Sequence, residues 1–255
     1  PVPFADGGSG GRRPAALRAA LEARLRADAP GTEAVLHVME GAATECLPEV
    51  ARQVGADLLV VGATRKNRIW RHFLGTTAEG VVRRAAAPGL VQRSPLVRGP
   101  RRVLLATDLS DASAAAHERG LDAAAALCPG CDPEVRSLLV VGGGAAPAAV
   151  PRAVLEDMGQ RELDAFVRGR RPRTRGVQCK VRVGVPADEI LAEASEWAAD
   201  LVVVGTHGRA GAVRFHLGST AGATLRGVPC NVLAVPALAR AAEALQPAPA
   251  PLPAA

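Results

Sequence analysis

Short apolar runs alternate with amphipathic stretches along most of this chain. The runs are rich in β-branched residues, as in Leu201–Val204, which is typical of strands buried on both faces of a parallel sheet. The stretches between them repeat apolar residues at helical spacing, and this alternation favours βαβ units and an α/β fold. The expected strands are 34–39, 58–61, 90–91, 102–106, 134–141, 177–183, 201–204 and 231–235. The expected helices are 14–27, 41–54, 76–84, 110–127, 150–167, 186–199 and 221–226.

The pattern occurs twice, with a constant offset of 143 residues. A shared offset over many positions indicates two copies of one domain. We expect a first repeat at 1–98, a second repeat at 99–237 and a disordered Pro/Ala-rich tail at 238–255. The matched pairs are Gly41 and Gly184, Asp57 and Asp200, Gly62 and Gly205, Gly75 and Gly218, and Thr76 and Ser219.

The two repeats differ in the number of strands that they contain. The second repeat has five expected strands, whereas the first has only the last three, so it lacks its first two strands. In a doubly wound sheet the first strand lies centrally, and its loss would leave a gap beside the fourth strand. We therefore expect one further strand–helix–strand unit upstream of Pro1.

Length and charge narrow the function classes. The 255 residues have room for about two domains, and no apolar run reaches the ~18 residues of a membrane span. With no secretory signal visible, we expect a cytoplasmic protein without a membrane partner. The net charge is +6, and Lys66 and Lys180 are the lysines among 31 basic residues. The arginines either reflect a compositional bias on solvated helix faces or mark a polyanion partner. An aromatic content of 2% makes nucleic acid the less favoured partner.

Five cysteines without a secretion signal indicate reduced thiols. Cys128 and Cys131 form a CxxC around a Pro-Gly turn where a helix is expected to end. A zinc site would need two more ligands nearby, and a redox motif would open a helix rather than close one. We interpret this motif as buried thiols beside a turn, and we expect no metal site.

A glycine-punctuated loop follows the apolar run at 201–204 and leads into a helix. Glycines allow a backbone with positive φ and a close approach to a ligand. A helix start adds N–H groups and roughly half a positive charge, and Ser219 and Thr220 add hydroxyl donors. The loop therefore predicts an anion site at the carboxyl end of a parallel strand.

The same loop carries a family resemblance. Gly205-x2-Gly208-x9-Gly218-Ser219 resembles the nucleotide-binding signature of the universal stress protein family. The resemblance implies α/β, doubly wound parallel-sheet domains of the adenine nucleotide alpha hydrolase-like, Rossmann-like type, with five strands in a complete copy. It also implies ATP, with or without Mg²⁺, in members that keep these glycines. Members pair through their last strands, so we expect an intramolecular pseudo-dimer or a homodimer. No Gly-Lys pair of a Walker-type loop occurs in the chain.

The resemblance assigns the parts of the nucleotide to residues of the second repeat. Asp108 would hold the ribose hydroxyls, although an Asp at this position also caps helices. The backbone of Val141 would hold the adenine edge, and the glycine loop would receive the ribose and phosphates. Arg209 could screen phosphate charge or face solvent. The complete set is Thr107, Asp108, Val141, Gly205, Thr206, Gly208, Arg209, Gly218, Ser219 and Thr220.

Catalytic machinery is not visible in the sequence. His207 is interpreted as a turn residue, and no positioned base accompanies it. In the first repeat Arg65 replaces the second glycine of the signature, and arginine resists positive φ, so we expect no nucleotide there. Three functions stay open: a nucleotide-dependent module of the stress response, a nucleotide-independent interaction protein that binds polyanions through Arg168–Arg175, and a weak ATPase.

Overall fold

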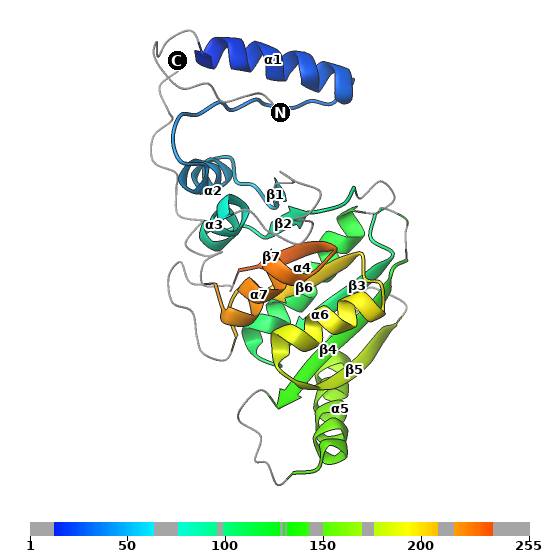
Figure 1. Cartoon of the computed structure of the whole chain (residues 1–255). Coiled ribbons are helices and arrows are strands. Elements are labelled where there is room, and N and C mark those ends of the chain that lie inside the picture. The colour runs from blue at the N-terminus through cyan, green and yellow to red at the C-terminus, as the bar shows by residue number, and fades with distance from the viewer. Residues whose placement is uncertain are drawn as a thin grey trace.

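The computed structural model describes residues 13–63, 76–95, 99–127, 130, 132–142, 150–169, 176–208 and 217–236. Seven strands in these ranges form one sheet with the order β1-β2-β7-β6-β3-β4-β5 (Figure 1). The strands are β1 (Leu59–Gly62), β2 (Gly89–Gln92), β3 (Arg102–Thr107), β4 (Glu134–Gly142), β5 (Val177–Gly184), β6 (Leu201–Gly205) and β7 (Asn231–Val235). The helices are α1 (Arg13–Asp28), α2 (Ala43–Gln53), α3 (Thr76–Arg84), α4 (Asp111–Leu127), α5 (Arg152–Arg168), α6 (Pro186–Glu196) and α7 (Ser219–Gly227).

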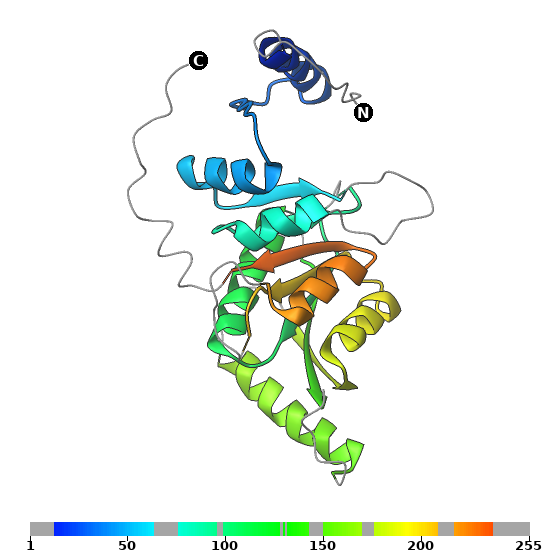
Figure 2. The same ribbon diagram turned by 60° about the vertical axis from the view of Figure 1, so that its left-hand side comes forward.

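The second repeat forms the predicted doubly wound sheet. Its five strands are parallel, and β3 lies between β6 and β4. Side chains of a strand point alternately to opposite faces, so Leu104 packs with α6 and α7 while Val103 and Leu105 pack with α4. Figure 2 shows helices on both sides of the sheet. The α/β class expected from the alternating pattern is therefore confirmed.

The first repeat contributes a smaller set of the same elements. Its α2 and α3 match α6 and α7 with the 143-residue offset at both ends, and β1 and β2 correspond to β6 and β7. Pro48 lies inside α2 as its sixth residue, beyond the first turn, so its missing N–H leaves one intrahelical hydrogen bond unmade. In both views α1 lies apart from the sheet (Figures 1 and 2). None of the helices in the described ranges has both the length and the apolar composition to cross a membrane.

The prediction of a strand at 34–39 is wrong. This segment forms no strand, and 83% of Val35 is exposed. Its counterpart in the second repeat is β5, which pairs along the length of β4. The described part of the first repeat contains no equivalent of β4, and a strand needs a neighbour for its backbone hydrogen bonds.

The two repeats join through their last strands. β2 pairs antiparallel with β7, with Leu90 opposite Leu233 and Val91 opposite Val232. All four side chains are almost completely buried, so the junction is a continuous part of the core. The pairing between repeats occurs here within one chain, and pairing between two chains stays a prediction.

Candidate functional site

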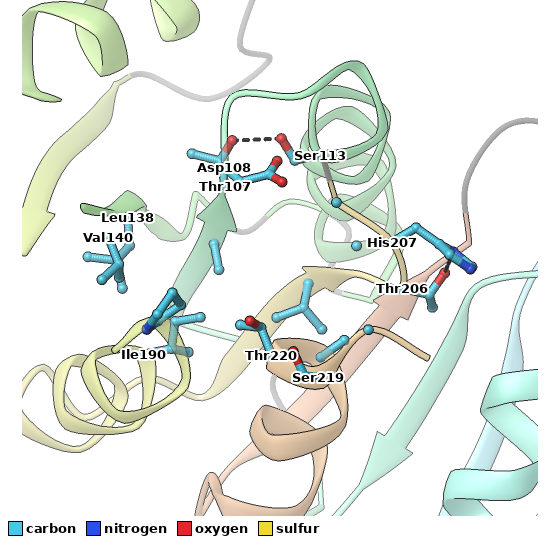
Figure 3. Close-up of a pocket in the computed structure, with 17 residues that line it drawn as sticks. Thr107, Asp108, Ser113, Leu138, Val140, Ile190, Thr206, His207, Ser219 and Thr220 are labelled. Carbon is cyan, nitrogen blue, oxygen red and sulfur yellow. Dashed lines mark hydrogen bonds between the residues drawn. The ribbon is translucent and has the colours of Figure 1, made fainter. Parts of the chain in front are cut away.

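A cavity of about 360 Å³ opens at the carboxyl ends of β3 and β6 (Figure 3). In the strand order these two strands are neighbours, and the chain leaves β3 toward β4 on one side and enters β7 from β6 on the other. Such a switch point is where open α/β sheets bind ligands. The cavity is lined by Ala106, Thr107, Asp108, Ser113, Leu138, Val140, Pro186, Ile190, Val204, Gly205, Thr206, His207, Gly208, Gly218, Ser219, Thr220 and Ala221.

Asp108 follows β3 and lies at the rim of this cavity. Its Oδ1 accepts hydrogen bonds from the backbone N–H of Ser110 at 3.1 Å and from the Ser110 hydroxyl at 2.5 Å. The Ser110 hydroxyl oxygen in turn accepts from the N–H of Ser113 in the first turn of α4. Ser110 therefore caps α4, and Asp108 orients the cap with one oxygen. The second oxygen, Oδ2, faces the backbone of Gly208.

The turn after β3 is held by a second group of hydrogen bonds. The Thr107 and Ser113 hydroxyls lie 2.9 Å apart, and Thr107 Oγ1 accepts from the N–H of Leu109 at 3.0 Å. Leu109 has a φ of 66°, a left-handed backbone that costs a residue with a Cβ about 1 kcal/mol or more. These bonds hold the strained turn in place, and with it the position of Asp108. The sequence did not mark Ser113.

The loop glycines are required by space rather than by backbone conformation. Positive φ was expected in this loop, but Gly205, Gly208 and Gly218 are not among the residues that have it, and Gly218 has a φ of −54°. A Cβ at Gly208 would lie 2.5 Å from Asp108 Oδ2, and a Cβ at Gly205 would lie 3.1 Å from the His207 carbonyl oxygen. The absence of a side chain lets the two loops approach each other.

The amino end of α7 forms one side of the cavity. Gly218 is its N-cap and supplies no side-chain hydrogen bond, and the N–H of Gly218 donates to the Thr206 carbonyl at 2.8 Å. The first N–H groups of a helix have no partner within the helix. With the hydroxyls of Ser219 and Thr220, they give this side of the cavity the character of an anion site.

His207 is buried, with 7% of its surface exposed. Its Nδ1 lies 2.8 Å from the Thr206 hydroxyl. In Figure 3 the His207 ring lies beside Thr206 and away from Thr107 and Asp108. The arrangement agrees with a residue that shapes the turn.

The opposite wall of the cavity is apolar. Leu138 and Val140 come from β4 and Ile190 from α6. Val141 does not appear among the lining residues, because its side chain points to the other face of β4 and packs beside α5. The backbone contact expected at Val141 stays a prediction. Alternation along the strand would have identified Val140, but apolar wall residues look like ordinary core residues in a sequence.

An ion-pair network holds α6 against the sheet. The buried Glu193 of α6 accepts from Arg136 of β4 at 2.5 Å and from Arg182 of β5 at 2.7 Å. The hydrogen bond to Glu196 raises the pKa of Arg182 and those to Glu189 and Glu193 add to the shift, while burial opposes it. Arg136 also lies over the Trp197 ring, 4.2 Å from its centroid. The network fixes the helix that carries Ile190 to the cavity.

Other predicted residues lie outside the described ranges. These include Arg209, Cys128, Cys131, the arginines of 170–175 and the first-repeat loop at 64–75. Cys46, Cys179 and Cys230 are free cysteines. In the ranges that the structure describes, no three His, Cys, Asp or Glu side chains gather closely enough to hold a metal ion.

Known proteins share this fold and sequence pattern. The profile of the Universal stress protein family matches residues 4–93 and 99–236. Universal stress protein A homolog 2 of Coxiella burnetii is 49% identical over 55 residues, which are 22% of this chain and 37% of that protein. The match therefore spans little more than a third of that relative.

Solved structures resemble most of the chain. A Pseudomonas aeruginosa UCBPP-PA14 protein described as a universal stress protein has a TM-score of 0.67 and 16% identity, covering 92% of this chain and 83% of its own. A universal stress protein of Archaeoglobus fulgidus has a TM-score of 0.59 and 19% identity, covering 87% and 78%. These likenesses support the fold, and the profile match to two segments that include most of the residues decides the family. The chain belongs to the universal stress protein family.

Proposed function

We propose that the second repeat binds ATP or a related adenine nucleotide and acts as a nucleotide-dependent module in the stress response. The cavity of about 360 Å³ falls in the size range of small-molecule sites. Its apolar wall of Leu138, Val140 and Ile190 suits a flat aromatic base. The cytoplasmic location and the identity of protein partners stay predictions.

One observation supports this proposal above the others. Asp108, Gly208 and the amino end of α7 border the same cavity, so an acceptor for ribose hydroxyls lies across from donors for phosphates. A carboxylate can accept from two vicinal hydroxyls, and helix amides can bind phosphate oxygens. Mg²⁺ would add charge compensation on the phosphates, because it is usually held through phosphate oxygens and water.

Binding rather than fast catalysis is the better proposal. Among the described lining residues, Asp108 and His207 carry the carboxylate and imidazole side chains that enzymes use as general bases. Asp108 Oδ1 is engaged by Ser110, and His207 contacts Thr206. A general base must reach the attacking nucleophile, and neither arrangement aims a base at a phosphate. Slow hydrolysis is therefore the most that we expect.

The test is direct titration of the purified, nucleotide-free chain with ATP, AMP and adenosine, together with mass spectrometry of any small molecule that co-purifies. We expect adenine nucleotide to be released on denaturation and to rebind. An Asp108→Asn variant should bind both ATP and adenosine more weakly than the parent, because both ligands carry the ribose. If the parent binds none of the three ligands, the proposal is overturned.

A further inference from the structure

The junction between the repeats reaches the far end of α7. Arg93 follows β2 in the first repeat and is 7% exposed. Its guanidinium donates to the Leu225 carbonyl and, at 3.4 Å, to the Arg226 carbonyl. These are among the last carbonyls of α7, where a helix has no internal donors left and carries partial negative charge. Arg93 is therefore a cap on α7 supplied by the other repeat.

The backbone around Arg93 is itself fixed to the second repeat. The Asn231 side-chain oxygen accepts from the N–H groups of Arg93 at 2.7 Å and of Ser94 at 3.0 Å. Asn231 is completely buried at the start of β7. Burial lowers the pKa of Arg93, which reflects the cost of removing its charge from water, and the helix carbonyls offset part of that cost.

A second contact joins α7 to the first repeat, this time to its helix α3. Arg226 of α7 donates to Glu79 of α3 at 2.9 Å. The relation is not symmetrical, because the residue that matches Arg93 in the second repeat is Pro236, which has no side-chain donor. The first repeat therefore caps α7, but the second repeat has no equivalent cap for α3 at this position.

We propose that the first repeat sets the position of the α7 amino end through Arg93, which thus acts as a positioning residue for the phosphate side of the cavity. α7 is nine residues long, or about 13 Å at 1.5 Å per residue, and a helix of this length moves as a rigid unit. Fixing its carboxyl end therefore fixes Gly218, Ser219 and Thr220, which line the cavity at its other end. The assignment of this side to phosphates rests on the proposed nucleotide function.

The contact between Arg93 and the carboxyl end of α7, called the tether below, leads to a specific expectation for ligand binding. Asp108 follows β3, and the apolar wall lies on β4 and α6, whereas the hydrogen bonds described above join Arg93 to α7 and to Asn231. Loss of Arg93 should therefore weaken the binding of ligands that carry phosphates and leave the binding of adenosine unchanged. General loosening of the fold would weaken both.

The experiment titrates ATP and adenosine into the full chain and its Arg93→Met variant. Arg84→Met is the matched control, since Arg84 also lies on the first repeat but pairs with Glu45 at 3.1 Å within that repeat. We expect ATP binding to weaken about tenfold in Arg93→Met, a usual size for coupling between sites, with adenosine binding and the control unchanged. If Arg93→Met weakens the binding of ATP and adenosine equally, or changes the binding of neither, the proposed role of Arg93 is overturned.

Hydrogen exchange tests the tether without any nucleotide. In Arg93→Met the amides of 217–221 should exchange about tenfold faster than in the parent and in Arg84→Met, as expected for a locally freed helix end. Unchanged exchange there would contradict the inference even if ATP binds. Failure of the parent to bind ATP would sink the proposed function and leave exchange to decide the tether.

Two milder variants cover the case in which Arg93→Met does not fold. Arg93→Lys keeps the charge but replaces the guanidinium, whose Nη2 donates to both carbonyls, with an ammonium on a shorter side chain. Glu79→Gln removes the partly exposed ion pair with Arg226 and leaves the core intact. Both should speed exchange at 217–221 by a smaller factor than Arg93→Met, and rates equal to the parent in both would contradict the tether.

Discussion

Val60 of β1 and Val203 of β6 occupy matching positions in the two repeats, but 52% of Val60 is exposed and 1% of Val203. On the second repeat, β3 pairs beside β6 and α4 packs over Val203 so closely that a Cβ at Gly120 would lie 2.6 Å from it. The described part of the first repeat has no such strand and helix. The same local sequence therefore forms the same strand in both places, and its neighbours decide its burial.

The helices show the same contrast. Leu47 of α2 is 41% exposed, whereas its counterpart Ile190 of α6 is 3% exposed and lines the cavity. The glycines differ as well, because a Cβ at Gly62 would meet no atom of the described residues within 4 Å, whereas one at Gly205 would meet the His207 carbonyl at 3.1 Å. The repeats thus share a sequence pattern, but the described contacts of a binding cavity belong to the second.

The largest expected effect comes from placing a charge at the matched valines. Val203→Asp should cost more than about 4 kcal/mol of unfolding free energy, because it buries an unpaired carboxylate. Val60→Asp should change stability by about 0.5 kcal/mol or less, as is usual for exposed sites. Urea denaturation of the two variants measures both values. Similar losses would show that β1 is covered in solution.

The matched helix positions should differ next. Ile190→Ala should cost about 2–5 kcal/mol, because the side chain is buried against the sheet. The same substitution should also weaken the binding of adenosine, since Ile190 lines the cavity. Leu47→Ala should cost about 1 kcal/mol or less. Thermal unfolding and adenosine titration measure the two effects. A larger loss of stability in Leu47→Ala than in Ile190→Ala would contradict the contrast between the repeats.

A third experiment removes from the second repeat the loop glycine that the first repeat also lacks, since the first has Arg65 where the second has Gly208. Gly208→Val should weaken ATP at least about 100-fold, or about 2.7 kcal/mol, because its Cβ would lie 2.5 Å from Asp108 Oδ2. Gly176→Val is the control, since a Cβ there would meet no atom within 4 Å in the part of the chain that the structure describes. ATP binding by Gly208→Val at parental strength would exclude this cavity as the site.

The smallest effect is a pH dependence at the junction. Burial raises the pKa of Cys230 to about 11 from 9.0, so the folded thiol keeps its proton after the unfolded thiol has lost it. Stability should therefore fall as pH rises from about 9 to 11, by about 1–3 kcal/mol. Cys230→Ala, which introduces the residue of the first repeat at Ala87, should lose less over this range. Denaturation under reducing conditions at pH 8 and 11 compares them, and parallel losses would reject the assignment.

The sequence by itself determined most of the elements and many of the residues that line the candidate cavity. Apolar runs located all seven strands of the sheet, and the 143-residue offset related α2 to α6 and α3 to α7. The glycine spacing placed Gly208 and Ser219 beside the same cavity as Asp108. Such features follow from local rules, namely side-chain periodicity and the chemistry of turns and helix starts.

The tertiary structure decided the rest. It left 34–39 without a strand, because no described neighbour offers hydrogen bonds to it. It assigned the loop glycines to close approach rather than to positive φ, and it selected Val140 and Ile190 from many similar core residues. It also brought Arg93 to the end of α7, 132 residues away in sequence from Leu225. Each of these depends on which segments meet in space, and a local pattern carries no information on contacts between distant segments.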